Sequence, residues 1–293
     1  MNKVDIKTME VAMGYIDMAQ GLLRRVLDNV KQSSDQVDDG SSELSSKLDS
    51  EKTFLNFIEG DSNKMARTVG KSIAEQKEVH SFNPFFIYGP SGCGKTHLIN
   101  AVGVLYKHLN PQKNVVYVGA RQFQMQYTES VRQNTTVQLI DFYLSADILI
   151  VDDIQEWTNA PKTLETFCYI FNQLVSGGKQ VILACDRPPV KLKGMKKDLL
   201  TRFASGLVVE IEIPNGQLRI DILRAKCSQY GMDIQDGIIE YIARNVSGSV
   251  CALEGVVNSL KAYSMVNTAI DMQLAERVIK SLFNGIDKVK NDK

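Results

Sequence analysis

Apolar positions near the start of the chain recur every three or four residues. Between residues 4 and 30 they are Ile6, Met9, Met13, Ile16, Leu23, Leu27 and Val30, with the polar Gln20 in the one gap. This spacing predicts an amphipathic helix within residues 1–31 and is the pattern of a short coiled coil. The spacing is compatible with two roles for the apolar stripe. It could associate with another helix or dock on the chain's own domain.

Residues 32–52 break this pattern. Serine, aspartate and glycine dominate the segment, and large apolar side chains are almost absent. Because such a segment buries too little apolar surface to offset the entropy lost on ordering, we expect a flexible linker.

Residues 53–214 alternate short apolar runs with helical patterns. The runs predict strands at 85–88, 114–118, 147–151, 180–184 and 207–213. The helical patterns between them fall at 95–109, 121–132, 162–176 and 195–203. Nearly continuous apolar strands separated by helices predict an α/β fold, in which a parallel sheet carries helices on both faces.

After Pro214 only helical periodicity remains. The predicted helices are 217–230, 235–246, 250–266 and 271–284. We therefore expect a small all-helical domain in residues 215–286, followed by a basic tail in residues 287–293.

Charge and cysteine usage narrow the class of protein. The 34 basic and 34 acidic residues cancel, so any attraction to nucleic acid must come from local patches. Five scattered cysteines favour reduced thiols over a disulfide framework or a zinc site. Asp5 and Glu10 argue against a signal peptide, and no apolar run approaches the roughly 18 residues of a membrane span. We expect a cytoplasmic protein that does not bind membranes.

The most specific motif is a phosphate-binding loop with the spacing G-x-x-x-x-G-K-[ST]. Its residues are Gly89, Pro90, Ser91, Gly92, Cys93, Gly94, Lys95 and Thr96. The loop follows a predicted strand and opens a predicted helix, which is the context that the motif requires. Its backbone N–H groups and the helix N-terminus are expected to hold phosphates. Lys95 should reach the outer phosphates, and Thr96 should bind Mg²⁺.

Further candidates follow later strands. Asp152 and Asp153 end the third strand, where P-loop ATPases manage the metal and the attacking water. We expect Asp152 to hold Mg²⁺ through its hydration shell and Asp153 to orient or deprotonate the water. Asp186 follows the fourth strand and either senses the terminal phosphate or only begins a turn before Pro188. Arg202 is either a finger that contacts a neighbouring subunit's nucleotide or a surface ion-pair residue.

Several motifs carry a resemblance to a known family. They occupy residues 53–63, 82–89, 94–97, 151–155, 186–189, 201–203 and 253–255. Together they resemble the ATPase core of the bacterial replication initiator DnaA, notably in Lys-Thr-His, Asp-Asp-Ile-Gln and Asp-Arg-Pro-Pro. The resemblance runs from about residue 50 to about residue 285 and implies an AAA+ module with a helical lid that binds ATP or ADP.

The resemblance also implies roles for single residues. Segment 53–63, with Phe57 and Ile58, matches the part that contacts adenine. His97 belongs to the triplet that ends the phosphate-binding motif. Arg202 would face the ATP of the next subunit in an assembly.

Departures from the family are as informative. The chain stops where a duplex-reading helix-turn-helix domain would begin, so no direct reader of duplex origin boxes is expected. Cys251 occupies the place of the lid's sensor arginine, which implies slow hydrolysis. Asp198 stands where the family has a basic residue. Directly after Asp-Asp-Ile-Gln the family favours an aromatic residue, but this chain has Glu156 there and its aromatic residue, Trp157, one position later.

Contacts to single-stranded DNA are expected to be weak. The positions that match the family's DNA contacts are Thr128 and Lys162, and only the lysine keeps the family's residue type. Lys162 could equally be an exposed residue at a helix start. A second basic cluster, formed by Lys191, Lys193, Lys196 and Lys197, faces nucleic acid, an acidic partner or only solvent.

Two functions from different classes remain. The first is a DnaA-like ATPase of replication initiation or its regulation, which assembles with itself or with the initiator and meets single-stranded DNA or the replicative helicase. The second is a nucleotide-gated adaptor, similar to a helicase loader, with little hydrolysis. A fragment of a longer initiator is a third explanation, which the N-terminal helix argues against.

Overall fold

The computed structural model describes residues 48–76, 82–246, 248–266 and 269–283. These residues belong to one compact unit. The predicted amphipathic helix, residues 32–47 of the predicted linker and the basic tail lie outside the described residues. Within them, no helix is both long and apolar enough to cross a bilayer.

A parallel sheet of five strands organises the described residues, with the strand order β2-β3-β4-β1-β5. The strands are β1 (Phe85–Tyr88), β2 (Val115–Gly119), β3 (Ile148–Asp152), β4 (Gln180–Cys185) and β5 (Leu207–Glu210). All neighbouring pairs run parallel. Because helices cover both faces, the inner strands are buried on each side, which explains their continuous apolar runs. The predicted α/β fold is confirmed.

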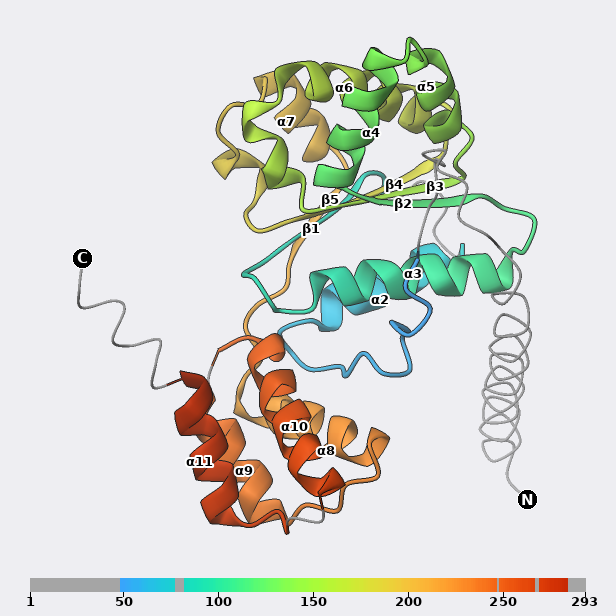
Figure 1. The fold of residues 1–293 in the computed structure, drawn as a ribbon. Coiled ribbons are helices and arrows are strands. Elements are labelled where there is room, and N and C mark those ends of the chain that lie inside the picture. Colours follow the sequence, from blue (N-terminus) through green and yellow to red (C-terminus); the bar gives the residue numbers. More distant parts are fainter. Residues whose placement is uncertain (1–47, 77–81, 247, 267–268, 284–293) are drawn as a thin grey trace, which may run out of the picture. The chain divides into compact units, whose positions relative to one another are not determined.

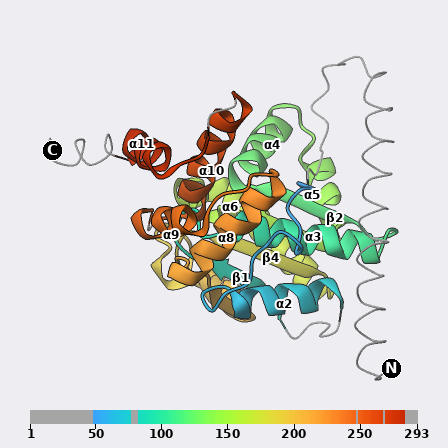
Figure 2. The same cartoon turned by 90° about the horizontal axis from the view of Figure 1, so that it is seen from below.

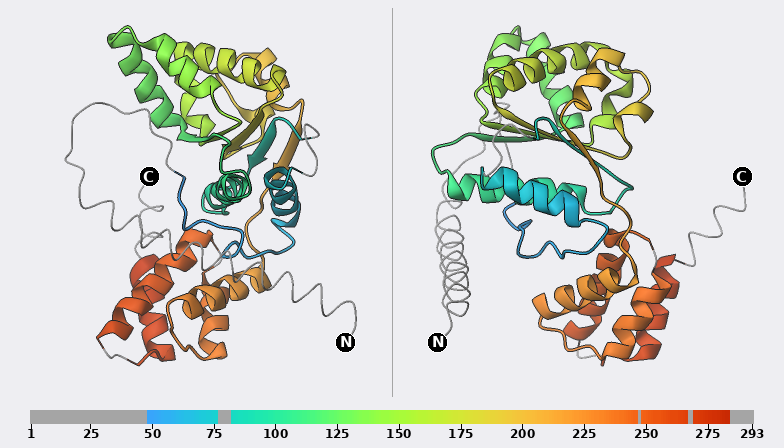
Figure 3. Two further views of the ribbon diagram at one scale, coloured as in Figure 1. Left: turned by 90° about the vertical axis from the view of Figure 1, so that its right-hand side faces the viewer. Right: turned by 180° about the vertical axis from the view of Figure 1, so that it is seen from behind.

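Two helical layers enclose the sheet (Figure 1). One face carries α2 (Lys64–Ala74) and α3 (Lys95–Leu109). The other carries α4 (Ala120–Arg132), α5 (Thr136–Leu144), α6 (Pro161–Ser176) and α7 (Lys197–Phe203). Helices α2 and α3 lie side by side (Figure 3), and Gly70 permits this approach because a β-carbon there would come within 2.9 Å of Val102.

The lid consists of four described helices with a core of their own. They are α8 (Gly216–Gln229), α9 (Asp236–Asn245), α10 (Val250–Met265) and α11 (Met272–Phe283). Helix α10 packs on both α8 and α11 (Figure 2). Buried side chains such as Leu223, Ile242, Leu253 and Val257 hold the four helices together.

Strand β5 is shorter than the sequence predicts. It ends at Glu210, whereas the apolar alternation continues to residue 213. The Ile211 N–H still donates to the Tyr88 carbonyl over 2.7 Å, but the Glu212 N–H donates to Ser62 over 3.2 Å. The chain therefore leaves the sheet toward the segment before β1.

Three more local features differ from the expectation. Helices α2 and α5 were not predicted, and α7 begins at Lys197 rather than 195 because the extended Lys196 precedes it. Residues 48 and 49, expected in the linker, contact α3: Leu48 packs against Gly103, and the Asp49 N–H donates to Asn100 over 2.9 Å.

Candidate nucleotide site

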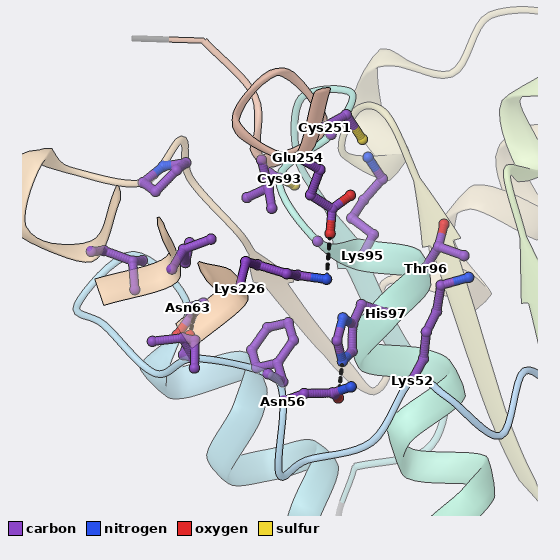
Figure 4. A pocket seen from close by; sticks show the side chains of 18 of the residues that line it. Lys52, Asn56, Asn63, Cys93, Lys95, Thr96, His97, Lys226, Cys251 and Glu254 are labelled. Atoms are coloured by element: carbon purple, nitrogen blue, oxygen red, sulfur yellow. Dashed lines mark hydrogen bonds and ion pairs between the residues drawn. The ribbon is translucent and has the colours of Figure 1, made fainter. Parts of the chain in front are cut away.

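A cavity of about 600 Å³ opens beyond the carboxyl ends of β1 and β3 (Figure 4). Most of its lining comes from three parts of the chain: residues 52–63 before the first strand, the phosphate-binding loop with the start of α3, and the lid helices α8 and α10. Asp153 after β3 and Glu212 and Pro214 after β5 complete the lining. The predicted site residues that line it are Phe57, Ile58, Ser91, Gly92, Cys93, Gly94, Lys95, Thr96, His97 and Asp153. The fold thus brings segments that are far apart in sequence to one site.

The loop's glycines are required by its backbone. Gly92 has φ +74° and Gly94 has φ +104°, both in the left-handed region that side chains rarely adopt. A β-carbon at Gly94 would also lie 3.3 Å from the Phe57 ring. These turns bring the chain into the N-terminus of α3, where free N–H groups and the helix dipole favour an anion.

Lys95 is held inside the loop. Its side chain is only 7% exposed, and its Nζ donates to the carbonyls of Gly89 and Pro90 over 2.8 and 2.9 Å. Gly89 and Pro90 do not themselves line the cavity in the described structure; they orient the ammonium group. A buried cation at a helix N-terminus is suited to bind phosphate.

Thr96 and Asp152 form the candidate metal site. The Thr96 hydroxyl donates to Asp152 Oδ2 over 2.6 Å, and the Tyr117 hydroxyl donates to the same oxygen over 3.2 Å. Burial raises the pKa of Asp152, opposed by the hydrogen bond from Thr96. A hydroxyl and a carboxylate are oxygen ligands, which are the type that Mg²⁺ prefers, so the donor set fits this ion.

Asp153 and Asp186 have different surroundings. Asp153 lines the cavity in a left-handed conformation with φ +56°, and its Oδ1 accepts from Gln155 Nε2 over 2.8 Å. The Asp186 carboxylate instead forms an ion pair with the Arg187 guanidinium over 2.6 Å. The hydrogen bond from Arg187 holds the pKa of Asp186 below its usual value. In the described structure Asp186 does not line the cavity.

Gln155 is a site residue that the sequence did not single out. Its Nε2 donates to Asp153, while its Oε1 accepts the Asp186 N–H over 3.1 Å. It therefore bridges the ends of β3 and β4. Its only signal in the sequence is its place at the end of Asp-Asp-Ile-Gln.

An apolar wall forms the other end of the cavity. Phe57 and Ile58 contribute from the segment before β1, and Leu218 and Ile222 contribute from α8. Asn63 closes the turn behind this wall, because it accepts from the Gly60 N–H and donates to the Ile58 carbonyl over 2.9 Å. A flat apolar ring fits such a wall.

The lid reaches the loop directly. The Val250 N–H donates to the Gly92 carbonyl over 2.8 Å, and Cys251 follows with its exposed thiol at the cavity. Lys226 from α8 and Glu254 from α10 form an ion pair of 2.8 Å across the lining (Figure 4). This pair was missed in the sequence because its partners are far apart along the chain.

The remaining candidates lie outside the cavity. Arg202 is exposed on α7 and donates to Asn172 Oδ1 on α6 over 2.8 Å. Thr128 is exposed on α4 and Lys162 at the start of α6. The basic cluster is exposed on and before α7, where Lys196 forms an exposed ion pair with Glu165.

A family model and individual relatives both point to one family. The family model of the bacterial DnaA ATPase domain matches residues 48–210. The chromosomal replication initiator protein DnaA of Bacteroides fragilis is 50% identical over 230 residues, which is 78% of this chain and 48% of that protein. The chain thus spans about half the length of the curated relatives that it matches.

Solved structures show the same similarity. Domain III of the Thermotoga maritima replication initiation protein DnaA aligns with a TM-score of 0.77 and 28% identity, over 80% of this chain and 98% of that chain. A replication initiator DnaA bound to AMPPCP and single-stranded DNA aligns with a TM-score of 0.68 and 33% identity, over 75% of this chain and 69% of that chain.

Proposed function

The chain belongs to the bacterial DnaA family, and from this premise we propose that it is an AAA+ ATPase that binds ATP or ADP with Mg²⁺ and acts in the initiation of DNA replication or its regulation. The observation that carries the proposal is the Thr96–Asp152 contact of 2.6 Å at the end of the glycine-rich phosphate loop, which lines one cavity together with an apolar base wall. A relative bound to an ATP analogue, AMPPCP, supports it.

The roles of the residues follow from their positions. Residues 89–96 hold the phosphates, Thr96 and Asp152 hold Mg²⁺, and Phe57 with Ile58 contacts the base. His97 follows this loop in the first turn of α3. Bound Mg²⁺ would neutralise charge on the outer phosphates. Asp153 orients or deprotonates the attacking water, and Gln155 fixes Asp153. Asp186 senses the terminal phosphate after releasing Arg187.

The proposed partners are proteins and single-stranded DNA. We propose that ATP promotes assembly with a second copy or with the initiator through Arg202. A relative bound to single-stranded DNA supports this nucleic acid as a ligand, and Lys162 and Thr128 are the weak contacts that we propose for it. The replicative helicase is a further proposed partner.

A specific observation favours the second function. Cys251 stands at the cavity next to the phosphate loop, where a thiol supplies no cation to the transition state. A nucleotide-gated adaptor with little hydrolysis therefore remains the alternative. Slow turnover is expected under either function.

Binding of fluorescent ATP to Lys95→Ala tests the site. The variant should lose binding, because it removes the only lysine that the described structure buries in the loop. Lys107→Ala, an exposed lysine of the same helix, is the matched control and should bind as the parent does. Equal binding by Lys95→Ala and the parent would contradict the site.

Steady-state ATPase assays with and without single-stranded DNA then separate the two functions. Turnover that responds to the DNA supports the replication ATPase. Tight ATP binding with no measurable turnover under both conditions supports the adaptor.

A further inference from the structure

His97 connects the phosphate cradle to the segment that forms the base wall. It follows Thr96 in the first turn of α3, and its Nε2 lies 3.0 Å from both the Thr53 carbonyl and Asn56 Oδ1 (Figure 4). Both partners accept hydrogen bonds, so Nε2 carries the proton. Burial lowers the pKa of His97, which disfavours the charged ring.

The acceptor on Asn56 is itself fixed. Asn56 Oδ1 also accepts the Thr53 N–H over 2.9 Å, and its Nδ2 donates to the Glu51 carbonyl over 2.7 Å. Oδ1 also accepts from the Thr53 hydroxyl over 3.1 Å, so the amide cannot turn without breaking three more hydrogen bonds. The turn that precedes Phe57 is held in one arrangement against α3.

Phe57 completes the connection. Its ring meets the His97 ring edge to face, with centroids 5.2 Å apart and an interplanar angle of 68°. The ring also lies against Gly94, which has no side chain to displace it. The position of Phe57 in the base wall is thus set by the hydrogen bonds of His97, which directly follows the metal-binding Thr96.

A second contact strengthens the attachment one turn later. Asn100 is 1% exposed, donates to the Thr96 carbonyl over 2.8 Å and accepts the Asp49 N–H over 2.9 Å. Segment 49–57 is therefore attached at two points to the helix that begins at the phosphate cradle.

We propose that His97 is the positioning residue that fixes the base wall relative to the phosphate loop and thereby sets how tightly the base of a bound nucleotide is held. The proposal rests on the proposed ATP site. His97 makes no proposed contact with the phosphates. Substituting it should therefore change the affinity only of ligands that carry a base.

The test compares three ligands in the presence of Mg²⁺: ATP, GTP and inorganic tripolyphosphate. His97→Ala should weaken ATP about tenfold, the effect of losing a hydrogen bond and its ring contact, and should leave tripolyphosphate unchanged. GTP should weaken as well, because its base would meet the same displaced wall. His97→Gln keeps a side-chain N–H donor and should restore part of the ATP affinity.

His108→Ala is the matched control, because His108 is exposed near the end of the same helix and should leave all three affinities unchanged. Asn56→Ala removes one acceptor and gives a second, independent variant if His97→Ala does not fold. It should shift ATP affinity in the same direction without affecting tripolyphosphate.

Two results would overturn the inference alone: an equal loss of ATP and tripolyphosphate binding in His97→Ala and Asn56→Ala, or no loss in either variant. A parent chain that binds neither ligand would overturn the proposed function together with this inference. The tripolyphosphate measurement on the parent distinguishes the two cases.

Discussion

The Val250 main-chain N–H donates to the Gly92 carbonyl over 2.8 Å, and this contact joins the lid to the phosphate loop. It is possible because residue 92 has no side chain. A β-carbon there would lie 2.7 Å from Ser249 Oγ and 3.4 Å from Cys251 Sγ. The lid therefore closes on the loop at a glycine.

Gly92→Ala should weaken ATP binding by more than tenfold. The new methyl group would displace the lid, and the residue would be strained at φ +74°. Gly255→Ala in α10 is the matched control: a β-carbon there meets nothing within 4 Å, so stability should rise by ~0.5–1 kcal/mol with ATP affinity unchanged. Titration calorimetry and thermal unfolding measure both effects. Parent-like affinity in Gly92→Ala would mean that this contact is not needed for binding.

Asp153→Asn should keep ATP binding and lose most residual hydrolysis. Asparagine tolerates the left-handed conformation found at φ +56° and can still accept from Gln155, so the backbone is preserved. It cannot act as a base, and a loss of roughly 10²-fold in turnover is expected. Asp141→Asn on the exposed face of α5 is the control. Equal turnover in the variant and the parent would show that Asp153 does not serve hydrolysis.

Cys251→Arg should raise turnover by about tenfold. The residue lines the cavity beside Gly92, so a guanidinium group there can reach the charge that develops on the outer phosphate. Cys251→Ser changes the side chain without adding charge and should leave the rate unchanged. If the arginine variant gains nothing over the serine variant, the missing cation does not limit hydrolysis.

Asp147→Asn tests an electrostatic contact at the opposite edge of the sheet. The carboxylate accepts from Lys179 over 2.7 Å and from the Asn114 N–H over 2.9 Å. Burial alone would raise its pKa, but these hydrogen bonds outweigh it and lower the pKa to about 2. The unfolded chain therefore binds more protons between pH 4 and 2, so the stabilisation is complete above that window and is lost as pH falls through it.

The variant should cost about 2 kcal/mol at pH 7. Its urea unfolding should also depend less on pH below 4 than that of the parent. A variant with the parent's pH dependence would show that Asp147 is not the group responsible.

Local chemistry explains what the sequence could predict. The phosphate loop and α3 were located correctly, because the motif marks the start of the helix at Lys95 and its apolar period runs to Leu109. Buried parallel strands were equally clear, since their apolar runs are continuous. Each of these signals is formed by residues that are close together in the sequence.

Contacts between distant segments could not be predicted. His97 meets Thr53 and Asn56 only after α3 packs beneath the preceding segment, and the pairing of Lys226 with Glu254 requires α8 and α10 to be adjacent. The short β5 has the same origin, because the Glu212 N–H bonds to Ser62 instead of continuing the sheet. In each case tertiary packing, not local pattern, selects the partner.

The last prediction concerns assembly through Arg202. Its guanidinium is exposed on α7, outside the cavity, and donates to Asn172 over 2.8 Å. Arg202→Ala should therefore leave the ATP affinity of the single chain unchanged. If the arginine reaches a neighbour's nucleotide, the variant should weaken ATP-dependent oligomers, because each interface loses a charge-assisted contact.

Two further variants make this prediction specific. Asn172→Ala removes the intramolecular partner but keeps the guanidinium, so it should oligomerise as the parent does; the same loss in both variants would indicate a purely structural role for Arg202. Deletion of residues 1–31 should reduce self-association with ATP and with ADP alike if the predicted apolar stripe associates, whereas Arg202→Ala should act only with ATP. Light scattering at several protein concentrations separates these effects. A parent that stays monomeric at high concentration with ATP would contradict assembly and favour the nucleotide-gated adaptor.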